Sequence, residues 1–292
     1  MSEEIKGFDS DKEYTDEYFK YRMQSDGTFS VEILKAKERL SVPREFQKIP
    51  VTAVVGNENE IPSGADGVLS VKLSPGLRRI GRRAFFGFRN LLVINIPSTV
   101  EVIEAFAFSG CESLEGITVG RGVISILDEA FSGCKSLCEV KLPDSLISID
   151  DRAFFGCKSL KKIKIPKLVN SIGDCAFSHC DSLMSFEVDD KNSFFTTFCG
   201  ALFSKNTERL LKYPGAPTVS QFLMPNSVKS VSRDAFLDAK SLKRIFISDS
   251  LEEVEGDDLI PLSKNEEPRR IASRCEIGKL YGRISVFARI QE

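Results

Sequence analysis

The sequence predicts a strand-dominated solenoid, in which similar coils stack along one axis with a parallel sheet on one side and short helical turns. Three observations predict it. Ala-Phe pairs recur every 23 residues, a Leu-x-x-Ile-x-Ile pattern follows each pair, and proline stands directly after several of these patterns. A stack of coils can grow without a larger spherical core, so the 292 residues need not divide into two globular domains.

The Ala-Phe pairs fix the length of the repeat. Five pairs follow one another at a spacing of 23 residues, at Ala84-Phe85, Ala107-Phe108, Ala130-Phe131, Ala153-Phe154 and Ala176-Phe177. A sixth pair, Ala235-Phe236, lies 59 residues further on, which is one repeat plus an insertion of 36 residues. We therefore expect the phenylalanines of successive copies to line up in one buried column.

Each copy also contains the alternation of a strand with one buried face. Ile163 and Ile165, which follow Leu160, are two residues apart, and their side chains point to the same face of an extended chain. Pro166 stands directly after them, and its missing N–H ends the hydrogen-bond ladder. A second apolar pair then forms a short extended return. The pattern predicts nine strands in one parallel sheet, centred near residues 41, 72, 95, 118, 141, 164, 187, 223 and 246.

The consensus L-x-x-I-x-I-P-x-x-V-x-x-I-x-x-x-A-F-x-G-C resembles the BspA-like class of leucine-rich repeats over about residues 38–259. The insertion is also similar to that family, because FFTTFCGALFSKNTERLLKYPGAP resembles its recurrent short hairpin followed by Tyr-Pro. The resemblance implies an α/β leucine-rich-repeat solenoid with the curvature of a horseshoe and a parallel sheet on its concave side. It also implies bacterial or protist proteins that often adhere to host matrix or to other cells.

The chain is expected to contain three segments. They are an acidic N-terminal segment with a capping hairpin at 1–37, the solenoid at 38–259 with its insertion around 190–224, and a C-terminal cap or tail at 260–292. The hairpin is predicted because FKYRMQSDGTFSVEIL alternates on both sides of Asp26-Gly27, a frequent turn dipeptide. A C-terminal capping strand is predicted by the alternation of Ile284, Val286, Ala288 and Ile290.

Composition argues against several functional classes. The net charge of −2 provides no global field for nucleic acid or anionic lipid, and no apolar stretch is long enough to cross a membrane. His179 is the only histidine, so a Ser-His-Asp mechanism could use no other residue and a site with several histidine ligands is impossible. We therefore expect no enzyme, no cofactor and no metal. The alternative is an enzyme whose site is not visible in the sequence.

His179 occupies a position at which four other copies have glycine. A glycine that recurs after a short turn indicates a left-handed backbone, which histidine adopts more readily than most residues. We therefore expect a positive φ at His179. A zinc site formed with Cys175 and Cys180 is the functional alternative, but it would lack a fourth ligand and a known spacing.

Four cysteines share the next position of the repeat, namely Cys111, Cys134, Cys157 and Cys180. Adjacent strands lie about 4.8 Å apart, which is within reach of a disulfide, so stacked bridges are one reading. Phe88 and Ala239 occupy the same position in the first and last copies, which indicates a buried apolar site. We therefore expect buried free thiols, since a free cysteine packs as a small apolar residue.

The outward positions of the predicted strands vary from copy to copy while the core positions repeat. This combination is what a recognition surface requires, although a solvated surface would also satisfy it. The densest basic run, KSLKKIKIPK, lies on this face and lacks the interleaved aromatic residues that single-stranded nucleic acid needs. The candidate protein-binding residues on the face are Glu139, Lys141, Lys162, Lys164, Glu187, Arg244 and Phe246.

These observations favour a non-catalytic scaffold that binds another protein, in cell-surface adhesion or, alternatively, as a cytoplasmic interaction scaffold. We expect a monomer with a protein partner, no nucleic acid and no membrane span. The opening MSEEIKGFDSDKEYTDEY lacks the apolar core of a secretory signal. If Met1 is the native start, the expected location is the cytoplasm. If a signal peptide was removed, it is the cell surface or the medium.

Overall fold

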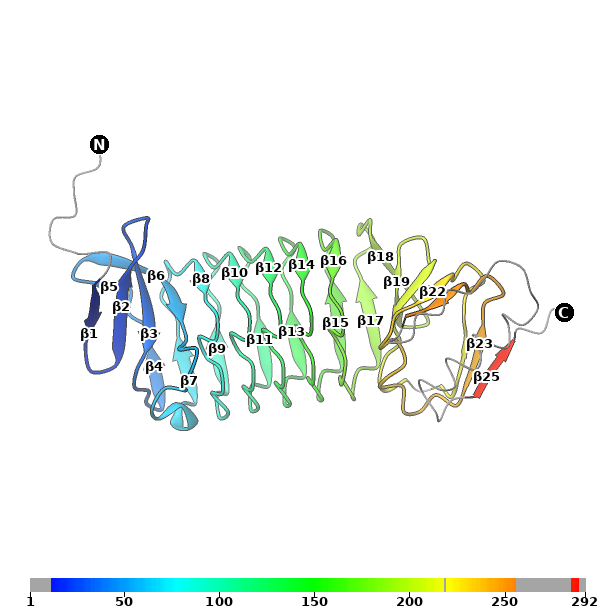
Figure 1. Ribbon diagram of the computed structural model, residues 1–292, viewed down its shortest axis with the longest axis horizontal. Coiled ribbons are helices and arrows are strands. Elements are labelled where there is room, and N and C mark those ends of the chain that lie inside the picture. The colour runs from blue at the N-terminus through cyan, green and yellow to red at the C-terminus, as the bar shows by residue number, and fades with distance from the viewer. Residues whose placement is uncertain (1–11, 218, 256–284, 289–292) are drawn as a thin grey trace. The chain divides into compact units, whose positions relative to one another are not determined.

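The computed structural model describes residues 12–217, 219–255 and 285–288. The chain divides into two compact units, which interleave in the sequence. The first unit comprises Met1–Lys158 and Ser171–Phe177, and the second comprises Ser159–Asn170 and Ser178–Glu292. Each unit is a stack of coils with strands that pair in parallel from one coil to the next (Figure 1).

In the first unit the short return strands join the N-terminal strands in a continuous sheet of ten strands. Its order is β1 (Glu13–Thr15), β2 (Phe19–Met23), β3 (Phe29–Ile33), β6 (Ile49–Val55), β8 (Arg79–Ile80), β10 (Val102–Ile103), β12 (Ser125–Ile126), β14 (Ser148–Ile149) and β16 (Ser171–Ile172), and β5 (Glu45–Phe46) pairs with β6. From β8 to β16 the isoleucines of neighbouring coils are direct partners in parallel register. The positions that the sequence indicated only as an extended return therefore build the longest sheet.

The predicted hairpin is present at the N-terminal side of this sheet. Strands β2 and β3 pair antiparallel on either side of Asp26-Gly27, and Gly27 adopts a φ of 78°. Strand β3 then pairs in parallel with β6, so the hairpin continues directly into the sheet of the coils. The division into segments at residues 37 and 259 stays a prediction.

The other face of the first unit carries the strands at the Ile-x-Ile sites. They form two sheets, one of β4 (Arg39–Ser41), β7 (Ser70–Lys72) and β9 (Val93–Asn95), the other of β11 (Gly116–Thr118) and β13 (Glu139–Lys141). The prediction of one parallel sheet at these sites is therefore wrong. The ladder is interrupted between β9 and β11, where β11 begins with a glycine, a residue that weakens a strand because it has the largest backbone entropy to lose.

A column of phenylalanine rings runs through the core of the first unit, as predicted. Phe108, Phe131, Phe154 and Phe177 are buried, and neighbouring rings stack with centroids 5.0 to 5.6 Å apart and interplanar angles of 3 to 6°. Backbone hydrogen bonds between successive coils run along this column. The N–H of each of Phe85, Phe108, Phe131 and Phe154 donates to the carbonyl of the alanine in the next Ala-Phe pair, at 2.7 to 2.9 Å. Every regular coil is thus bound to the next through the same hydrogen bond.

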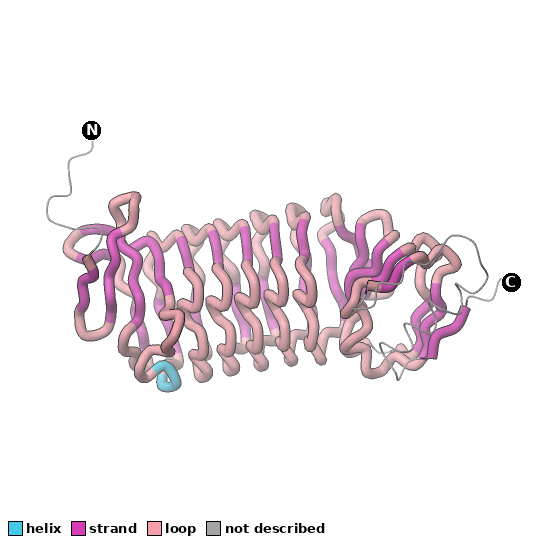
Figure 2. The backbone as a smooth tube through the Cα atoms, in the orientation of Figure 1, coloured by secondary structure: helices cyan, strands magenta, loops and turns pink. Residues whose placement is uncertain are grey.

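The Ala-Phe segments form turns in place of the short helices that were expected. In the five turns spaced by 23 residues, two residues adopt a left-handed backbone, as at Phe106 (φ 59°) and Gly110 (φ 76°), and this interrupts any helical run. Figure 2 shows the result. Among the residues that the structure describes, the only helical element is the 3-10 turn η1 (Ala65–Gly67). The α/β character implied by the resemblance is not confirmed, whereas the strand-dominated parallel solenoid is.

The described residues of the second unit form three sheets. They are β15 (Lys162–Ile165) with β17 (Ser185–Val188); β18 (Phe195–Phe198), β19 (Ala201–Ser204), β20 (Arg209–Lys212), β22 (Ser230–Val231) and β24 (Glu253–Val254); and β21 (Gln221–Leu223), β23 (Arg244–Ile247) and β25 (Ser285–Ala288). The insertion supplies the antiparallel hairpin β18–β19 and then β20, which pairs in parallel with β22. It therefore rejoins the stack through an additional coil.

All nine strands predicted at the Ile-x-Ile sites are present, because each is specified by two apolar residues that face the core. The C-terminal alternation also forms a strand, since β25 includes Val286 and Ala288 and pairs in parallel with β23. Ile284 and Ile290, which belong to the same prediction, lie outside the described residues.

Candidate functional site

In the first unit the candidate face includes Glu139 and Lys141 of β13. Both side chains are about two-thirds exposed, and the Lys141 ammonium lies 3.0 Å from the Glu139 carboxylate. An ion pair with this exposure contributes little to stability, because water solvates both charges almost as well. Breaking this ion pair so that either side chain can bind a partner would therefore cost little free energy.

In the second unit β15 and β17 present the basic run of the sequence. Lys162 and Lys164 are 61% and 62% exposed, and their neighbour Ile163 is buried, as the alternation predicts. Lys162 lies 3.5 Å from Glu187, and Lys164 lies 3.3 Å from Asp189. The surface is thus a mosaic of paired charges.

Asp189 is a member of this mosaic that sequence reasoning missed. The backbone N–H of Lys191 and the ammonium of Lys164 hold the pKa of its carboxyl below the ordinary value for aspartate. Asp189 follows β17 directly, and its backbone N–H bonds to the Ile165 carbonyl of the preceding coil. Its position after the strand, outside the alternation, is why the pattern did not reveal it.

Arg244 and Phe246 lie on β23, in a different sheet from β15 and β17. Arg244 is exposed, whereas Phe246 is half-buried. The structure therefore brings Glu139 together with Lys141 in the first unit and Lys162 together with Glu187 in the second, and it places Arg244 and Phe246 in a separate sheet of the second unit. Their role in binding stays a prediction.

The cysteine column lies inside the protein. Cys111, Cys134, Cys157 and Cys180 are buried, as predicted. The thiols of Cys111, Cys134 and Cys157 each approach the carbonyl of the phenylalanine in the preceding copy of the repeat, at 3.2 to 3.3 Å. Burial raises the pKa of the Cys134 thiol to about 12, so the thiolate, which is the nucleophilic and metal-binding form, is disfavoured.

His179 adopts a φ of 59°, which confirms the left-handed turn. Its side chain is 47% exposed, and its Nδ1 lies 3.7 Å from Oδ1 of Asp238. The backbone N–H of His179 donates to Oδ2 of the same carboxylate at 2.8 Å. Because both contacts are made to one aspartate, His179 is part of a charged network in the second unit.

The centre of that network is Lys212, a buried lysine in the insertion. Its ammonium donates to the Asp234 carbonyl at 2.7 Å, to Oδ2 of Asp234 at 3.0 Å and to the Ser178 hydroxyl at 3.4 Å, and it forms an ion pair with Oδ2 of Asp238 at 3.1 Å. Ser178 donates its hydroxyl to the Asp234 carboxylate. These acceptors satisfy the three protons of the ammonium. The cluster therefore has a structural role, and the Lys212 amine is not available for reaction.

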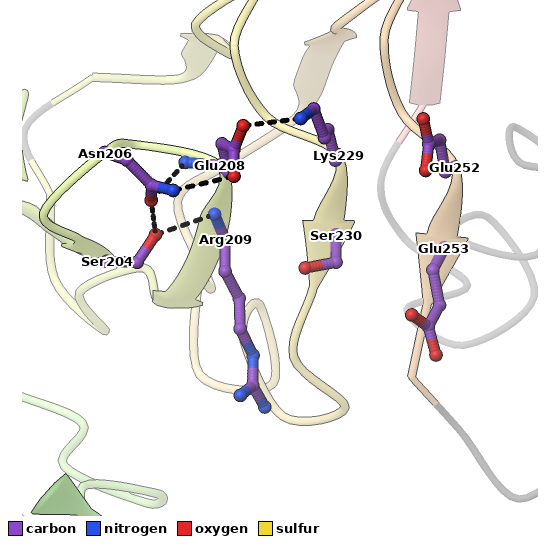
Figure 3. A pocket seen from close by; sticks show the side chains of 8 residues that line it. All are labelled: Ser204, Asn206, Glu208, Arg209, Lys229, Ser230, Glu252 and Glu253. Carbon is purple, nitrogen blue, oxygen red and sulfur yellow. Dashed lines mark hydrogen bonds and ion pairs between the residues drawn. The ribbon is translucent and has the colours of Figure 1, made fainter.

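A shallow pocket of about 390 Å³ lies over β20, β22 and β24 of the second unit (Figure 3). Its lining residues are Ser204, Asn206, Glu208, Arg209, Lys229, Ser230, Glu252 and Glu253. Most of these side chains bond to one another or to close neighbours. Ser204 donates to Asn206, Asn206 donates to Glu208, and Arg209 lies 2.7 Å from Glu255. The polar groups thus satisfy each other, and they do not converge on a common point where a substrate would react.

Within residues 12–217, 219–255 and 285–288, no three side chains of the metal-ligating types gather around a common point. Among the same residues there is also no helix with the length and apolarity to cross a membrane.

Comparison with known proteins gives one family. The model of the BspA type leucine-rich repeat region matches residues 66–208 and 213–258 in six copies. The matched residues include the regular coils of the first unit and the coils on both sides of the insertion. Among curated proteins, no sequence matches the chain.

Several solved structures are similar to the chain. A leucine-rich cell surface protein from Faecalibacterium prausnitzii is 26% identical with a TM-score of 0.65, and the match covers 84% of this chain and 73% of that one. A leucine-rich repeat protein of T. pallidum is 29% identical with a TM-score of 0.54, covering 60% of this chain and 82% of that one. The pneumococcal vaccine antigen PcpA, 22% identical with a TM-score of 0.70 over 87% of this chain and 69% of its own, shares the fold.

Proposed function

Because the chain belongs to the BspA-type leucine-rich repeat family, we propose that it is a non-catalytic scaffold that binds another protein through the outward face of its Ile-x-Ile strands. The observation that carries the proposal is the contrast along β13 and β15. Val140 and Ile163 are buried at equivalent positions, while the outward residue before each changes from Glu139 to Lys162. The outward residue after each is a lysine, Lys141 or Lys164, and all four outward side chains are more than half exposed. A constant interior with a variable surface is how repeat proteins present a binding face.

The cell surface is the proposed place of action. It is supported by the similar protein from Faecalibacterium prausnitzii, which is described as a cell surface protein. We further propose that the outward face lines the concave side of a curved solenoid, as the resemblance implies. Small-angle X-ray scattering tests the curvature, because a straight stack and an arc of the same length give different pair-distance distributions.

Charge reversal at β15 tests the binding face. Lys162→Glu with Lys164→Glu should leave folding almost intact, because substitutions of exposed charges usually change stability by no more than about 0.5 kcal/mol. Association with an acidic partner should become slower and less dependent on salt. The partner is first identified by crosslinking on intact cells and purified, and association rates are then measured by surface plasmon resonance at several salt concentrations.

The matched control reverses two exposed lysines that lie outside the sheet face. Lys191→Glu with Lys205→Glu changes the net charge by the same amount in the insertion. If association slows equally in both double variants, only long-range attraction is involved. If neither variant affects association, the proposed face is wrong. A thermal melt of each variant separates loss of binding from loss of folding.

A further inference from the structure

Gly116 leaves a gap in the outward face of the first unit. It is the first residue of β11, its side-chain position points to solvent, and its partner in the parallel register is Glu139 of β13. On the other side lies β9, where Val93 holds the same position one repeat earlier and is 55% exposed. At this outward position β9 has a valine, β11 has no side chain and β13 has a glutamate. We call the empty position the Gly116 gap.

The fold does not require glycine at this position. The backbone φ of Gly116 lies outside the left-handed region, in contrast to the glycines of the turns. A Cβ added there would meet only the Glu139 carbonyl at 3.7 Å and the Glu139 Cβ at 4.0 Å, which are ordinary van der Waals contacts. Glycine inside a strand costs stability, and it often marks a place where another molecule approaches the backbone closely.

The two sides of the gap differ in chemistry. Leu69, Leu92 and Val93 are apolar and have exposed fractions of 38%, 44% and 55%, and the Leu92 N–H donates to the Leu69 carbonyl at 2.9 Å. On the other side is the exposed carboxylate of Glu139, and the exposed Glu115 directly precedes Gly116 in the same coil. Lys141 lies 3.0 Å from Glu139, but this pair is exposed and weak, and a carboxylate can accept from two cations at once.

We propose that the Gly116 gap receives a lysine or arginine side chain from a protein partner, an inference that rests on the proposed binding function. The methylene stem lies against Val93 and Leu92, and the cationic group reaches Glu139 and Glu115. Long basic side chains bury an apolar stem while the charge stays solvated or paired. A purely apolar side chain fits less well, because it would cover the Glu139 carboxylate with a group that cannot hydrogen-bond to it.

The test uses a phage-displayed random peptide library as the probe, selected against the full chain. We expect selected peptides to contain Lys or Arg beside an apolar residue. The affinity of a synthetic peptide made from the selected sequence is then measured by fluorescence anisotropy. Gly116→Val fills the gap and Glu139→Gln removes the charge, and each should weaken binding about tenfold or more.

The control is Thr118→Val, which changes the other outward residue of β11 without filling the gap and should leave the affinity unchanged. Gly116→Val should also melt at the same temperature as the wild type or higher, which a structural role for the glycine would not allow. Selected peptides without a basic residue, or peptide binding that Gly116→Val does not change, would overturn this inference and leave the proposed function standing. A library from which the wild type selects nothing, while a known binder selects its ligand, would count against both.

Discussion

The regular coils of the first unit and the inserted coil of the second unit make the same backbone contact with the next coil but use different side chains. In a regular coil an alanine is fully buried and the next residue is a phenylalanine, as at Ala153 and Phe154. In the inserted coil the corresponding residues are Lys212 and Tyr213, since the Tyr213 N–H donates to the Ala235 carbonyl at 2.8 Å, as Phe154 does to Ala176 at 2.9 Å. The backbone hydrogen bond is retained although both side chains differ.

The difference shows which part of a coil is fixed by its neighbours. A lysine in the alanine position would be a buried, unpaired charge if Asp234 and Asp238 did not supply acceptors from the next coil. The tyrosine ring does not stack in parallel as the phenylalanines do, because its plane is tilted by 39° relative to Phe236. The backbone hydrogen bond is therefore the feature that all coils share. The side chains beside it can be apolar or charged, as long as the next coil supplies side chains that match them.

The largest expected effect is on the regular side of the comparison. Phe131→Ala should lower the free energy of unfolding by about 3–5 kcal/mol, because it leaves a cavity between two rings that stack on it at 5.0 and 5.3 Å. Equilibrium denaturation with urea measures the loss. Phe155→Ala, at a half-buried turn position of the neighbouring coil, is the matched control and should cost clearly less. Equal losses would show that the column is not the main support of these coils.

The ionic side of the comparison is tested by Asp238→Asn. The substitution keeps the shape but removes one of the two charges that neutralise Lys212, so unfolding should become easier by about 1–3 kcal/mol. The matched control is Asp181→Asn, which breaks a solvent-exposed pair with Lys240 and should cost about 0–1 kcal/mol. If both substitutions have the same effect in urea denaturation, the buried network is not needed to hold the inserted coil.

The tyrosine of the inserted coil gives a pH dependence that the phenylalanine coils lack. Burial raises the pKa of Tyr213 from 10 to about 12, so the folded protein favours the neutral phenol. The resulting contribution to stability is fully present below about pH 10 and is lost as the pH rises towards 12. Tyr213→Phe should therefore match the wild type at neutral pH and lose less stability above pH 10 when both are denatured in urea. Parallel curves at all pH values would contradict this.

The smallest expected effect is at the turn that precedes the insertion. His179→Gly relieves a left-handed backbone at φ 59° but removes the contact with Asp238, so stability should change by less than about 1 kcal/mol and should not fall. The reciprocal substitution, Gly156→His in a regular coil, should be destabilising, because Gly156 has a φ of 72°, a backbone conformation that a side chain makes costly. A thermal melt of both variants distinguishes the outcomes. A clear loss in His179→Gly would show that the ionic contact outweighs the backbone strain.

The regular coils could be predicted from the sequence because their determinants are local and repeated. Ile163 and Ile165 mark a strand by their spacing, and Phe131 marks the core by its recurrence. The return strands could not be recognised as a sheet, because a two-residue strand such as β14 is too short to show alternation. The partners of Lys212 could not be predicted either. Asp234 and Asp238 lie more than twenty residues further along the chain, and only the fold brings them to the ammonium.

The candidate face likewise has features that could be predicted from the sequence and features that could not. The outward orientation of Lys162 and Lys164 follows from the alternation and is confirmed by their exposure. Their pairing with Glu187 and Asp189 depends on the register between β15 and β17, which the alternation of a single strand does not contain. Gly116 is visible in the sequence only as one more variable position. Its significance depends on the neighbours that the parallel register places beside it.

The hydrogen bond from each phenylalanine N–H to the alanine carbonyl of the next copy also bears on how such a gene can change. A regular coil offers the same donor on one side and the same acceptor on the other, so recombination between two copies that adds or removes a whole 23-residue unit rebuilds an equivalent contact at the junction. The length of the exposed face can therefore vary in single-unit steps while the interior chemistry stays the same. The coil that carries Lys212 lacks this freedom, because it must be inherited together with the coil that carries Asp234 and Asp238.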